Sequence, residues 1–461
     1  MPKHLNLLTV MFDSLRPDHI ATNGHPQIRT PNLDHFAAEG TVFARTYAEY
    51  PITIPSRTAF FCGIYTFTNR SWSTLRPYDT TLAEVLRREG YRTACFADSP
   101  MGTTVWDFDR GFDEFTYVAD GPCHTPVVEG REPDFGPYSV VRAENDDRAS
   151  AQRFLSQTRI NRQWSMETRG YYSPDTITHL ATEWLDNADT DKPFWLHLDY
   201  FDPHEPWDPP EPYMSMYDPG YTGKRYAMPT GPEIDWMTPE ELQQVRHLYM
   251  GKVTQVDDQL PALWKALREK GLAENTLVVI ISDHGEPFGE HRRIRKFGVP
   301  LYDELAACVM MMRLPGVVPE GKRVETLAQN VDMMPTLLDL FGVDDKPRMD
   351  GVSLVPIIQG KADTVREEAH IGAFQLRAGL VTDDGWKLID NRGEKPDELY
   401  RLPDDPQESR NLHADKADLA RSLHRRLWEF AARWHSPLSW RTGTDWQRDR
   451  PDGKPPPQRA R

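Results

Sequence analysis

The chain has 461 residues and a formal net charge of −16, from 54 Lys and Arg against 70 Asp and Glu. This acidity excludes broad binding to nucleic acid or to an anionic membrane surface, because both need a basic face. It is compatible with a small anionic substrate, since a bound metal ion reverses the sign of the charge locally.

The N-terminus carries no pattern typical of a secretory signal, and no stretch approaches the roughly eighteen apolar residues that a membrane span needs. The four cysteines are too dispersed for a disulfide framework or a cysteine-rich zinc site. We therefore expect a cytoplasmic protein without a membrane segment. The first apolar run, residues 5–12, predicts a strand that ends at Asp13.

Residues 51–63 predict a helix that begins near Thr53. Pro55 suits the first turn of a helix, where its missing N–H costs nothing, and Gly63 is a typical stop. Thr53 would then lie at a helix N-terminus, where free backbone N–H groups favour a bound anion. Arg57, one turn further on, would add a cation whose planar fork suits phosphate or sulfate. An ordinary threonine cap beside a surface arginine explains the same residues equally well.

The middle of the chain contains two segments without clear periodicity. Residues 120–173 are polar and rich in Arg, Glu, Gly and Pro, which predicts an insertion or a long loop. Residues 206–239, rich in Pro and aromatic residues, form a second such stretch. Between them, residues 195–201 predict a strand. A long helix is expected from residue 240 to about 270, because apolar residues recur there on one face.

Three apolar runs end in residues that bind metals or move protons. The alternation of strand-like runs with helical stretches predicts an α/β fold with a parallel sheet covered on both faces. Ligands bind to such a sheet beyond the carboxyl ends of its strands. The runs and the residues that follow them are 5–12 with Asp13, 195–201 with Asp202 and His204, and 277–281 with Asp283 and His284. The turn preference of Asp and His explains one such ending, but three together predict a shared site.

After residue 351 the periodicity weakens, and a small C-terminal α+β subdomain is expected. Its predicted elements are short strands at 369–374, 379–382 and 386–389 and a helix at 416–434. The chain would then divide into a large α/β domain that carries the site (1–365), the C-terminal subdomain (366–440) and a tail dense in Pro, Arg and Asp (441–461).

The segment Thr53-Ile-Pro-Ser-Arg57, followed by Cys62-Gly63, resembles the sulfatase signature Cys/Ser-x-Pro-Ser/Ala-Arg, with Thr in the place of Cys. Other segments match that family in order and spacing along most of the chain: 13–18, 30–34, 37–40, 111–113, 202–204, 282–285, 289–291, 331–332, 335–338, 350–353, 386–389, 398–400 and 405–406. By this resemblance the chain is identified as a member of the sulfatase family of the alkaline phosphatase superfamily. The resemblance implies a mixed, mostly parallel sheet sandwiched by helices, with a smaller C-terminal α+β subdomain.

The resemblance also implies the roles of site residues. It places a divalent cation among four ligands: Asp13, Thr53, Asp283 and His284. It places Arg57 beside the nucleophile Thr53, and His204 and Lys296 around the ester, where either would stabilise the leaving oxygen and give it a proton. Lys296 ends a charged run, residues 292–296, that would otherwise be a solvated face; its spacing after the third strand favours the catalytic role. For His291 a structural role is expected.

The signature departs from the family at the nucleophile itself. Sulfatases of the common kind oxidise the signature Cys or Ser to formylglycine, whose hydrate has one hydroxyl to attack sulfur and another to expel sulfate. Thr53 is a secondary alcohol, so its oxidation would give a ketone, and the unmodified residue has no second hydroxyl. Water must therefore clear an ester on Thr53 by attacking the central atom, which is ordinary for a phosphoryl-enzyme and poor for a sulfo-enzyme. Metal-bound Thr hydroxyls are nucleophiles in phosphodiesterases and phosphoethanolamine or phosphoglycerol transferases of the superfamily.

Two further departures favour phosphate or phosphonate esters. Ser14 follows Asp13 where many sulfatases have a second Asp, and Asp98-Ser-Pro100 stands where they carry a Lys-x-His pair. Phosphonate monoester hydrolases resemble this arrangement more closely, although they keep the signature Cys. One imidazole with two carboxylates favours Mn²⁺ or Zn²⁺ over Ca²⁺, with Mg²⁺ a further alternative. No second zinc-binding pattern accompanies His204, so one metal ion is expected.

These observations lead to three hypotheses. The first is a metal-dependent hydrolase of phosphate or phosphonate mono- or diesters with Thr53 as nucleophile. The second is a sulfatase that acts without formylglycine, and the third is a non-catalytic descendant that binds an anion. The expected partner is a small anionic ester. Residues 120–173 and 206–239 would enclose the leaving group of this ester. Assembly into a homo-oligomer stays open.

Overall fold

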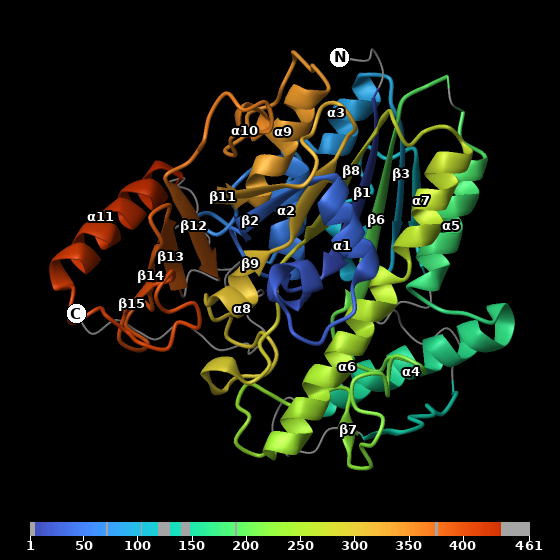
Figure 1. The fold of residues 1–461 in the computed structure, drawn as a ribbon, viewed down its shortest axis with the longest axis horizontal. Helices are drawn as coiled ribbons and strands as arrows, with labels where there is room; N and C mark the ends of the chain where they lie inside the picture. Colours follow the sequence, from blue (N-terminus) through green and yellow to red (C-terminus); the bar gives the residue numbers. More distant parts are fainter. Residues whose placement is uncertain are drawn as a thin grey trace.

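The computed structural model describes residues 5–70, 72–102, 104–118, 130–139, 148–189, 191–373 and 377–434. Within these ranges a nine-stranded sheet forms the centre of the molecule, with helices on both faces (Figure 1). Its strands are β1 (Asn6–Asp13), β2 (Thr41–Tyr47), β3 (Arg92–Ala97), β4 (Glu114–Tyr117), β6 (Phe194–Pro203), β8 (Thr276–Ser282), β9 (Ala307–Cys308), β10 (Met310–Arg313) and β11 (Lys322–Gln329). A separate two-stranded sheet pairs β5 (Tyr138–Ser139) with β7 (Arg225–Tyr226).

The main sheet has the order β11-β2-β10-β8-β1-β6-β3-β4, with β9 paired to β2. Only the pairs that β9 and β10 make are antiparallel within the described sheet. The predicted mostly parallel α/β sheet is therefore confirmed. The three strands expected to carry the site, β8, β1 and β6, are neighbours and run in the same direction.

Helices cover the two faces of this sheet. The helices of this part of the chain are α1 (Pro31–Glu39), α2 (Thr53–Cys62), α3 (Leu82–Arg88), α4 (Arg148–Arg169), α5 (Asp175–Asp186), α6 (Pro239–Asp257), α7 (Leu260–Glu269), α8 (Asp303–Ala306), α9 (Met333–Leu340) and α10 (Val355–Ile358), of which α4 lies beyond the end of the sheet (Figure 1). Leu8, Val10 and Phe12 of β1 pack into one core with α1, α5, α6 and α7, whereas Leu7 and Met11 pack into a second core with α2, α3, α9 and α10. Because side chains alternate along a strand, every second residue of β1 faces α2.

Two predictions about helices were wrong. Residues 148–169, which lie in the segment expected to be a loop, form the long helix α4. Its buried positions follow a helical spacing but include Thr158, Arg162 and Ser165, so the apolar periodicity that signals a helix is weak. The rest of the expected loop lies partly outside the described residues.

The helix expected from 240 to 270 is two helices, α6 and α7. Pro261 is the second residue of α7 and has no N–H to continue the hydrogen bonds of the preceding turn. The break therefore follows from one proline inside an otherwise continuous apolar pattern.

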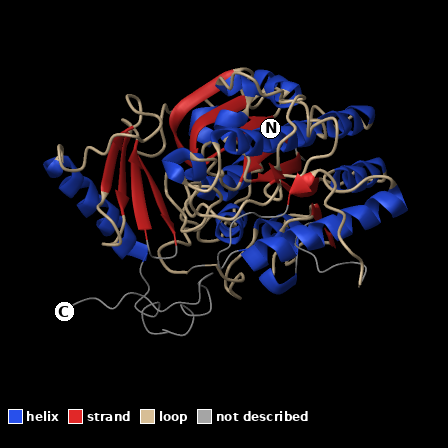
Figure 2. Ribbon diagram, turned by 90° about the horizontal axis from the view of Figure 1, so that it is seen from below, coloured by secondary structure: helices blue, strands red, loops and turns tan. Residues whose placement is uncertain are grey.

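The C-terminal part forms a small antiparallel sheet with a helix along one face (Figure 2). Its elements are β12 (Glu368–Ala373), β13 (Arg377–Thr382), β14 (Trp386–Asp390), β15 (Glu398–Arg401) and α11 (Ala417–Trp434). The three predicted strands and the helix are confirmed, and β15 is a fourth strand. Tyr50 and Ile52, just before α2, share a hydrophobic core with Leu380 of β13 and with Leu423 and Leu427 of α11.

The division of the chain at residue 365 stays a prediction, and the expected tail at 441–461 lies outside the described residues. The three described cysteines are free and buried. Among the described helices, none has the length and hydropathy that crossing a membrane requires.

Candidate active site

Asp13, Asp283 and His284 meet at the carboxyl ends of β1 and β8. Phe12 is paired in register with Ser282, so the residues that follow each strand emerge side by side. One ligand atom from each of the three side chains lies within 4.8 Å of the others, and all three residues are buried. The structure therefore brings together three of the four predicted metal ligands.

The protonation of His284 indicates what this cluster can hold. His284 Nδ1 lies 2.7 Å from the carbonyl oxygen of Gly285 and donates to it. Nε2 therefore directs a lone pair at Asp283 Oδ2, 3.4 Å away, and Asp13 Oδ1, 3.7 Å away. Burial and the nearby Lys296 lower the pKa of His284 to about 3, so the ring is neutral.

The cluster consequently has the donor set of a metal site. His284 Nε2 and Asp13 Oδ2 are buried and have no hydrogen-bond partner among the described residues. An uncharged nitrogen lone pair and carboxylate oxygens repel one another unless a cation lies between them. Burial and the neighbouring Asp283 raise the pKa of Asp13, because both disfavour its negative charge. A bound cation would stabilise that charge. The residues present thus fit a divalent ion.

Ser14 holds the two carboxylates in place. Its backbone N–H donates to Asp283 Oδ1 at 3.0 Å, and its hydroxyl donates to Asp13 Oδ1 at 3.0 Å. Ser14 has φ of 65°, in the left-handed region that non-glycine residues seldom adopt. This backbone turn at the end of β1 directs both donors back toward the cluster.

Thr53 is the first residue of α2, as predicted, and Gly63 ends the helix in a left-handed conformation. The first turn of α2 is fixed beside the cluster, because the Ser56 hydroxyl donates to the carbonyl oxygen of Asp283 at 2.7 Å. Thr53 is buried, with 2% of its surface exposed. Its carbonyl oxygen accepts a hydrogen bond from Arg57 Nη1 at 3.2 Å.

Arg57 contacts carboxylates of the protein and does not present an open fork to a substrate. Its Nε and Nη2 donate to the two oxygens of Asp199 at 2.8 and 2.7 Å. Nη1 also donates to Asp283, and Nη2 lies 3.2 Å from Asp13 Oδ2. Arg57 was expected to face an anion directly; in the structure it compensates the charge of three buried carboxylates.

Sequence reasoning missed Asp199, which lies within β6. Trp195 of β6 packs in the α2-side core, and alternation places His197 and Asp199 on the same face. Burial acts to raise the pKa of Asp199, but Arg57 outweighs it and holds the pKa below its ordinary value. The available signal was two polar residues at alternate positions in an otherwise apolar strand.

His204 and Lys296, predicted to surround the ester, are in direct contact. Lys296 Nζ lies 2.5 Å from His204 Nε2, and His204 Nδ1 lies 2.7 Å from the backbone carbonyl oxygen of Glu205 and 3.0 Å from its Oε2. Burial acts to lower the pKa of Lys296, but the carboxylates of Glu205 and Glu286 outweigh it and raise the pKa. A charged Lys296 therefore donates to His204 Nε2, which puts the imidazole proton on Nδ1 toward Glu205.

Glu205 and Glu286 were also missed, although each follows a predicted residue closely. Glu286 Oε2 lies 3.4 Å from Lys296 Nζ and 3.5 Å from Ser14 Oγ. Both carboxyl groups are buried. They connect the Lys296 side of the site with the metal-ligand side, and only the folded chain shows that connection.

The charged run at 292–296 divides between solvent and site. Arg292 is exposed, whereas Arg295 Nε donates to Glu205 Oε1 at 2.9 Å and Lys296 is mostly buried. His291 stacks on Tyr302 with ring centroids 3.5 Å apart, and its Nδ1 bonds to Glu304 Oε1 at 2.8 Å. The loop thus turns its last two cations inward while His291 packs against the fold.

The segment that aligns with the sulfatase Lys-x-His pair carries a structural carboxylate. Asp98 Oδ1 accepts from the backbone N–H of Phe201 at 2.6 Å, and Ser173 Oγ donates to Oδ2. Asp98 therefore joins the end of β3 to β6, and no cationic side chain stands in that segment.

Comparison with known proteins gives the family. Residues 5–343 match the sulfatase family, and residues 289–433 match the C-terminal region of N-sulphoglucosamine sulphohydrolase. The chain belongs to the sulfatase family. As a member, it is an enzyme that hydrolyses sulfate or phosphate esters, and enzymes of this family use a divalent metal ion.

Individual relatives cover nearly the whole chain. An arylsulfatase of Clostridium perfringens is 26% identical, over 88% of this chain and 90% of the relative. The multifunctional alkaline phosphatase superfamily protein PehA of Trinickia caryophylli is 26% identical, over 89% and 92%. The phosphonate monoester hydrolase of Agrobacterium radiobacter has the same fold, with a TM-score of 0.71 at 24% identity, over 93% of this chain and 96% of that one.

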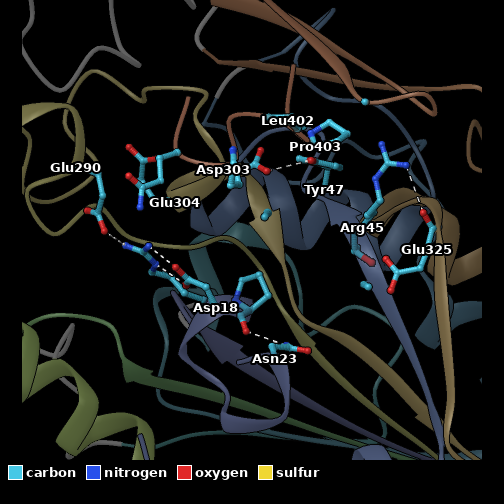
Figure 3. Close-up of a pocket in the computed structure, with 18 of the residues that line it drawn as sticks. Asp18, Asn23, Arg45, Tyr47, Glu290, Asp303, Glu304, Glu325, Leu402 and Pro403 are labelled. Carbon is cyan, nitrogen blue, oxygen red and sulfur yellow. Dashed lines mark hydrogen bonds and ion pairs between the residues drawn. The ribbon is translucent and has the colours of Figure 1, made fainter. Parts of the chain in front are cut away.

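A cavity of about 1130 Å³ lies elsewhere in this sulfatase-family fold, with Asp18, Glu290 and Asp303 on its walls (Figure 3). Its charges are paired: Arg16, for example, donates to Asp18 Oδ2 at 2.6 Å and to Glu290 Oε1 at 2.9 Å. Among the described residues that line the cavity, none is a predicted metal ligand. This cavity is therefore separate from the site of the expected chemistry.

Proposed function

We propose that the chain hydrolyses phosphate or phosphonate esters, with Thr53 as the nucleophile. The proposal rests on one observation: an unmodified threonine begins a helix whose first turn is bonded to the backbone of Asp283. In that position the Thr53 hydroxyl would attack the central atom of the ester while free N–H groups at the helix N-terminus favour the anionic group.

The number of hydroxyls on Thr53 favours phosphorus over sulfur. Attack by Thr53 Oγ forms a covalent ester and breaks the bond to the leaving oxygen. Formylglycine would then expel sulfate through its second hydroxyl, but threonine has none. Water must attack the central atom and release Thr53, and that step is ordinary at phosphorus and slow at a sulfate monoester.

Asp13, Asp283 and His284 would hold the divalent ion. When bound, such an ion lowers the pKa of a hydroxyl that contacts it and balances the charge of the ester. An imidazole with two carboxylates favours Mn²⁺ or Zn²⁺, although Ca²⁺ and Mg²⁺ are alternatives. Arg57 would keep the carboxylates ionised and oriented through its bonds to Asp283 and Asp199.

Lys296 and His204 would serve the leaving group. A charged Lys296 can give a proton to the departing oxygen, and His204 would orient the amine by accepting a hydrogen bond at Nε2. The backbone carbonyl oxygen of Glu205 accepts a hydrogen bond from His204 Nδ1, and the Glu205 carboxylate provides compensating negative charge. Replacing Lys296 or His204 should therefore reduce the rate of hydrolysis most for esters with poor leaving groups.

A sulfatase reaction without formylglycine is the second candidate. The sulfatase-family match and the arylsulfatase relative favour it, whereas PehA and the phosphonate monoester hydrolase favour the first. Matched nitrophenyl sulfate, phosphate mono- and diesters and a phosphonate monoester, each assayed with several metals, distinguish the two. Preference for phosphorus together with acid-stable phosphate on Thr53 after rapid quench supports the first. A preference for sulfate that survives in Thr53→Ala would contradict it.

A further inference from the structure

A second group of metal-binding side chains lies in the C-terminal part, away from the active site. One ligand atom each from Asp397, His413 and His424 lies within 4.8 Å of the others, and the three residues are partly buried. Asp397 precedes β15, His413 lies in the turn after β15, and His424 is on α11. Two imidazoles and a carboxylate are a donor set typical of Zn²⁺.

Neighbouring carboxylates face both ring nitrogens of His424. His424 Nε2 lies 3.2 Å from Asp397 Oδ2, while its Nδ1 faces Asp390 Oδ2 at 3.7 Å. Asp390 is itself fixed by Trp428 Nε1 at 2.9 Å and by the N–H of Arg392 at 2.8 Å. At 3.7 Å, Asp390 supports His424 through its charge and not through a hydrogen bond, on the side of the ring where metal-bound histidines commonly have a carboxylate.

The remaining ligands are held by backbone contacts. Asp397 Oδ1 accepts the N–H of Asn391 at 2.9 Å, which leaves Oδ2 facing the histidines. The N–H of His413 donates to Asn411 Oδ1 at 2.9 Å, and its ring lies edge-on to His424 with centroids 5.9 Å apart. Asp397 is thus positioned through its side chain, and His413 through its backbone and its ring contact with His424.

We propose that Asp397, His413 and His424 bind a divalent transition-metal ion, Zn²⁺ in the first instance, with water completing its coordination. The ion ties α11 to the turn and to the edge of the small sheet, and it balances the charges of Asp390 and Asp397. This proposal is independent of the reaction at Thr53. The competing arrangement is a protonated His424 between two carboxylates, without metal.

Zinc stoichiometry of the full-length chain tests this proposal. Protein stripped with a chelator is equilibrated with Zn²⁺, exchanged into metal-free buffer and analysed for zinc per chain. The variant His413→Gln/His424→Gln is expected to bind one equivalent less than the wild type. His35→Gln, an exposed histidine paired with Glu39 on α1, should match the wild type. Equal zinc content in the wild type and the double variant would overturn the site.

Two further variants test the zinc site if the double variant fails to fold. His413→Gln changes only a turn residue and should lose the same equivalent with unchanged ester hydrolysis. Asp390→Asn keeps the shape of the supporting group and should weaken zinc affinity by about 10- to 100-fold. Added Zn²⁺ should also raise the melting temperature of the wild type more than that of His413→Gln. Unchanged affinity in Asp390→Asn together with equal melting shifts would contradict the proposal.

Discussion

Arg57 and Asp199 form a two-point ion pair in the buried interior, with Nε and Nη2 at 2.8 and 2.7 Å from the two carboxylate oxygens. Neither side chain is exposed. The pair joins α2, which begins at Thr53, to β6, which leads to His204. This buried charged contact therefore fixes the helix that begins at Thr53 to the strand that leads to His204.

Removing one partner of this pair should destabilise the protein. Asp199→Ala leaves the guanidinium of Arg57 buried with less compensating charge, and we expect the free energy of unfolding to fall by about 3–5 kcal/mol. Chemical denaturation followed by circular dichroism measures it. Glu325→Gln breaks an exposed ion pair with Arg323 and should change stability by less than about 1 kcal/mol. Equal stability of the two variants would show that the Arg57 pair is not important for folding.

Replacing the nucleophile should separate chemistry from binding. Thr53→Ala is expected to lower kcat by about 10³-fold or more, because no hydroxyl remains to form the covalent ester. Thr53→Ser retains a hydroxyl and should keep measurable turnover of the phosphorus ester with a trapped phosphoserine. Steady-state kinetics and mass spectrometry after acid quench measure both. Wild-type turnover by Thr53→Ala would exclude nucleophilic catalysis at this residue.

The loss of activity caused by replacing Lys296 should increase with the basicity of the leaving group. Lys296→Met is expected to reduce kcat/KM for alkyl esters by about 10²- to 10⁴-fold. The loss should be much smaller for nitrophenyl esters, whose leaving oxygen needs no proton. Arg292→Met, an exposed cation in the same run, is the control and should leave both rates unchanged. Equal losses for the two classes of ester would argue against proton donation by Lys296.

Metal removal should abolish hydrolysis, and the choice of metal should reveal the ligand set. Dialysis against a chelator is expected to remove activity, with Mn²⁺ or Zn²⁺ restoring it better than Ca²⁺. Asp283→Asn should not regain activity at metal concentrations that saturate the wild type. Full activity after chelation, verified by metal analysis, would remove the role assigned to Asp13, Asp283 and His284.

Glu49 should make stability depend on pH. Burial raises its pKa from an ordinary value near 4.5 to about 8, and its carboxyl group accepts hydrogen bonds from Thr66 Oγ1 and the N–H of Phe67. The folded chain therefore holds this proton more tightly than the unfolded chain. The associated stability is fully present below about pH 4.5 and is lost as the pH rises toward 8. Denaturation at several pH values should show that Glu49→Gln gains stability relative to the wild type over this range; a constant difference would contradict the assignment.

The parts of the site that could be predicted are those where sequence position alone decides geometry. Asp13, Asp283 and His284 each follow a strand, and parallel strands end at one edge of the sheet. Thr53 was placed at a helix start because Pro55 suits the first turn of a helix and Gly63 is a typical stop. In each case the local pattern determined the structure without knowledge of the neighbours.

Asp199 and Glu286 could not be assigned because their partners come from distant segments. Asp199 meets Arg57 only because β6 lies beside β1 and presents alternate side chains to α2. Glu286 meets Lys296 through a loop with left-handed residues at His291 and Arg295, which sequence does not predict. The helix α4 escaped prediction because its buried face mixes polar residues with apolar ones, which weakens the apolar periodicity.

The shared core between the small sheet and the segment before Thr53 has a consequence for engineering. Tyr50 and Ile52 share a hydrophobic core with the small sheet and α11, so their side chains would lose this packing in a chain that lacks the C-terminal region. Chimeras with other family members should therefore exchange residues 47–52 together with the C-terminal region. A graft that exchanges the C-terminal region alone would disturb this shared core and, through it, the position of Thr53 at the start of α2.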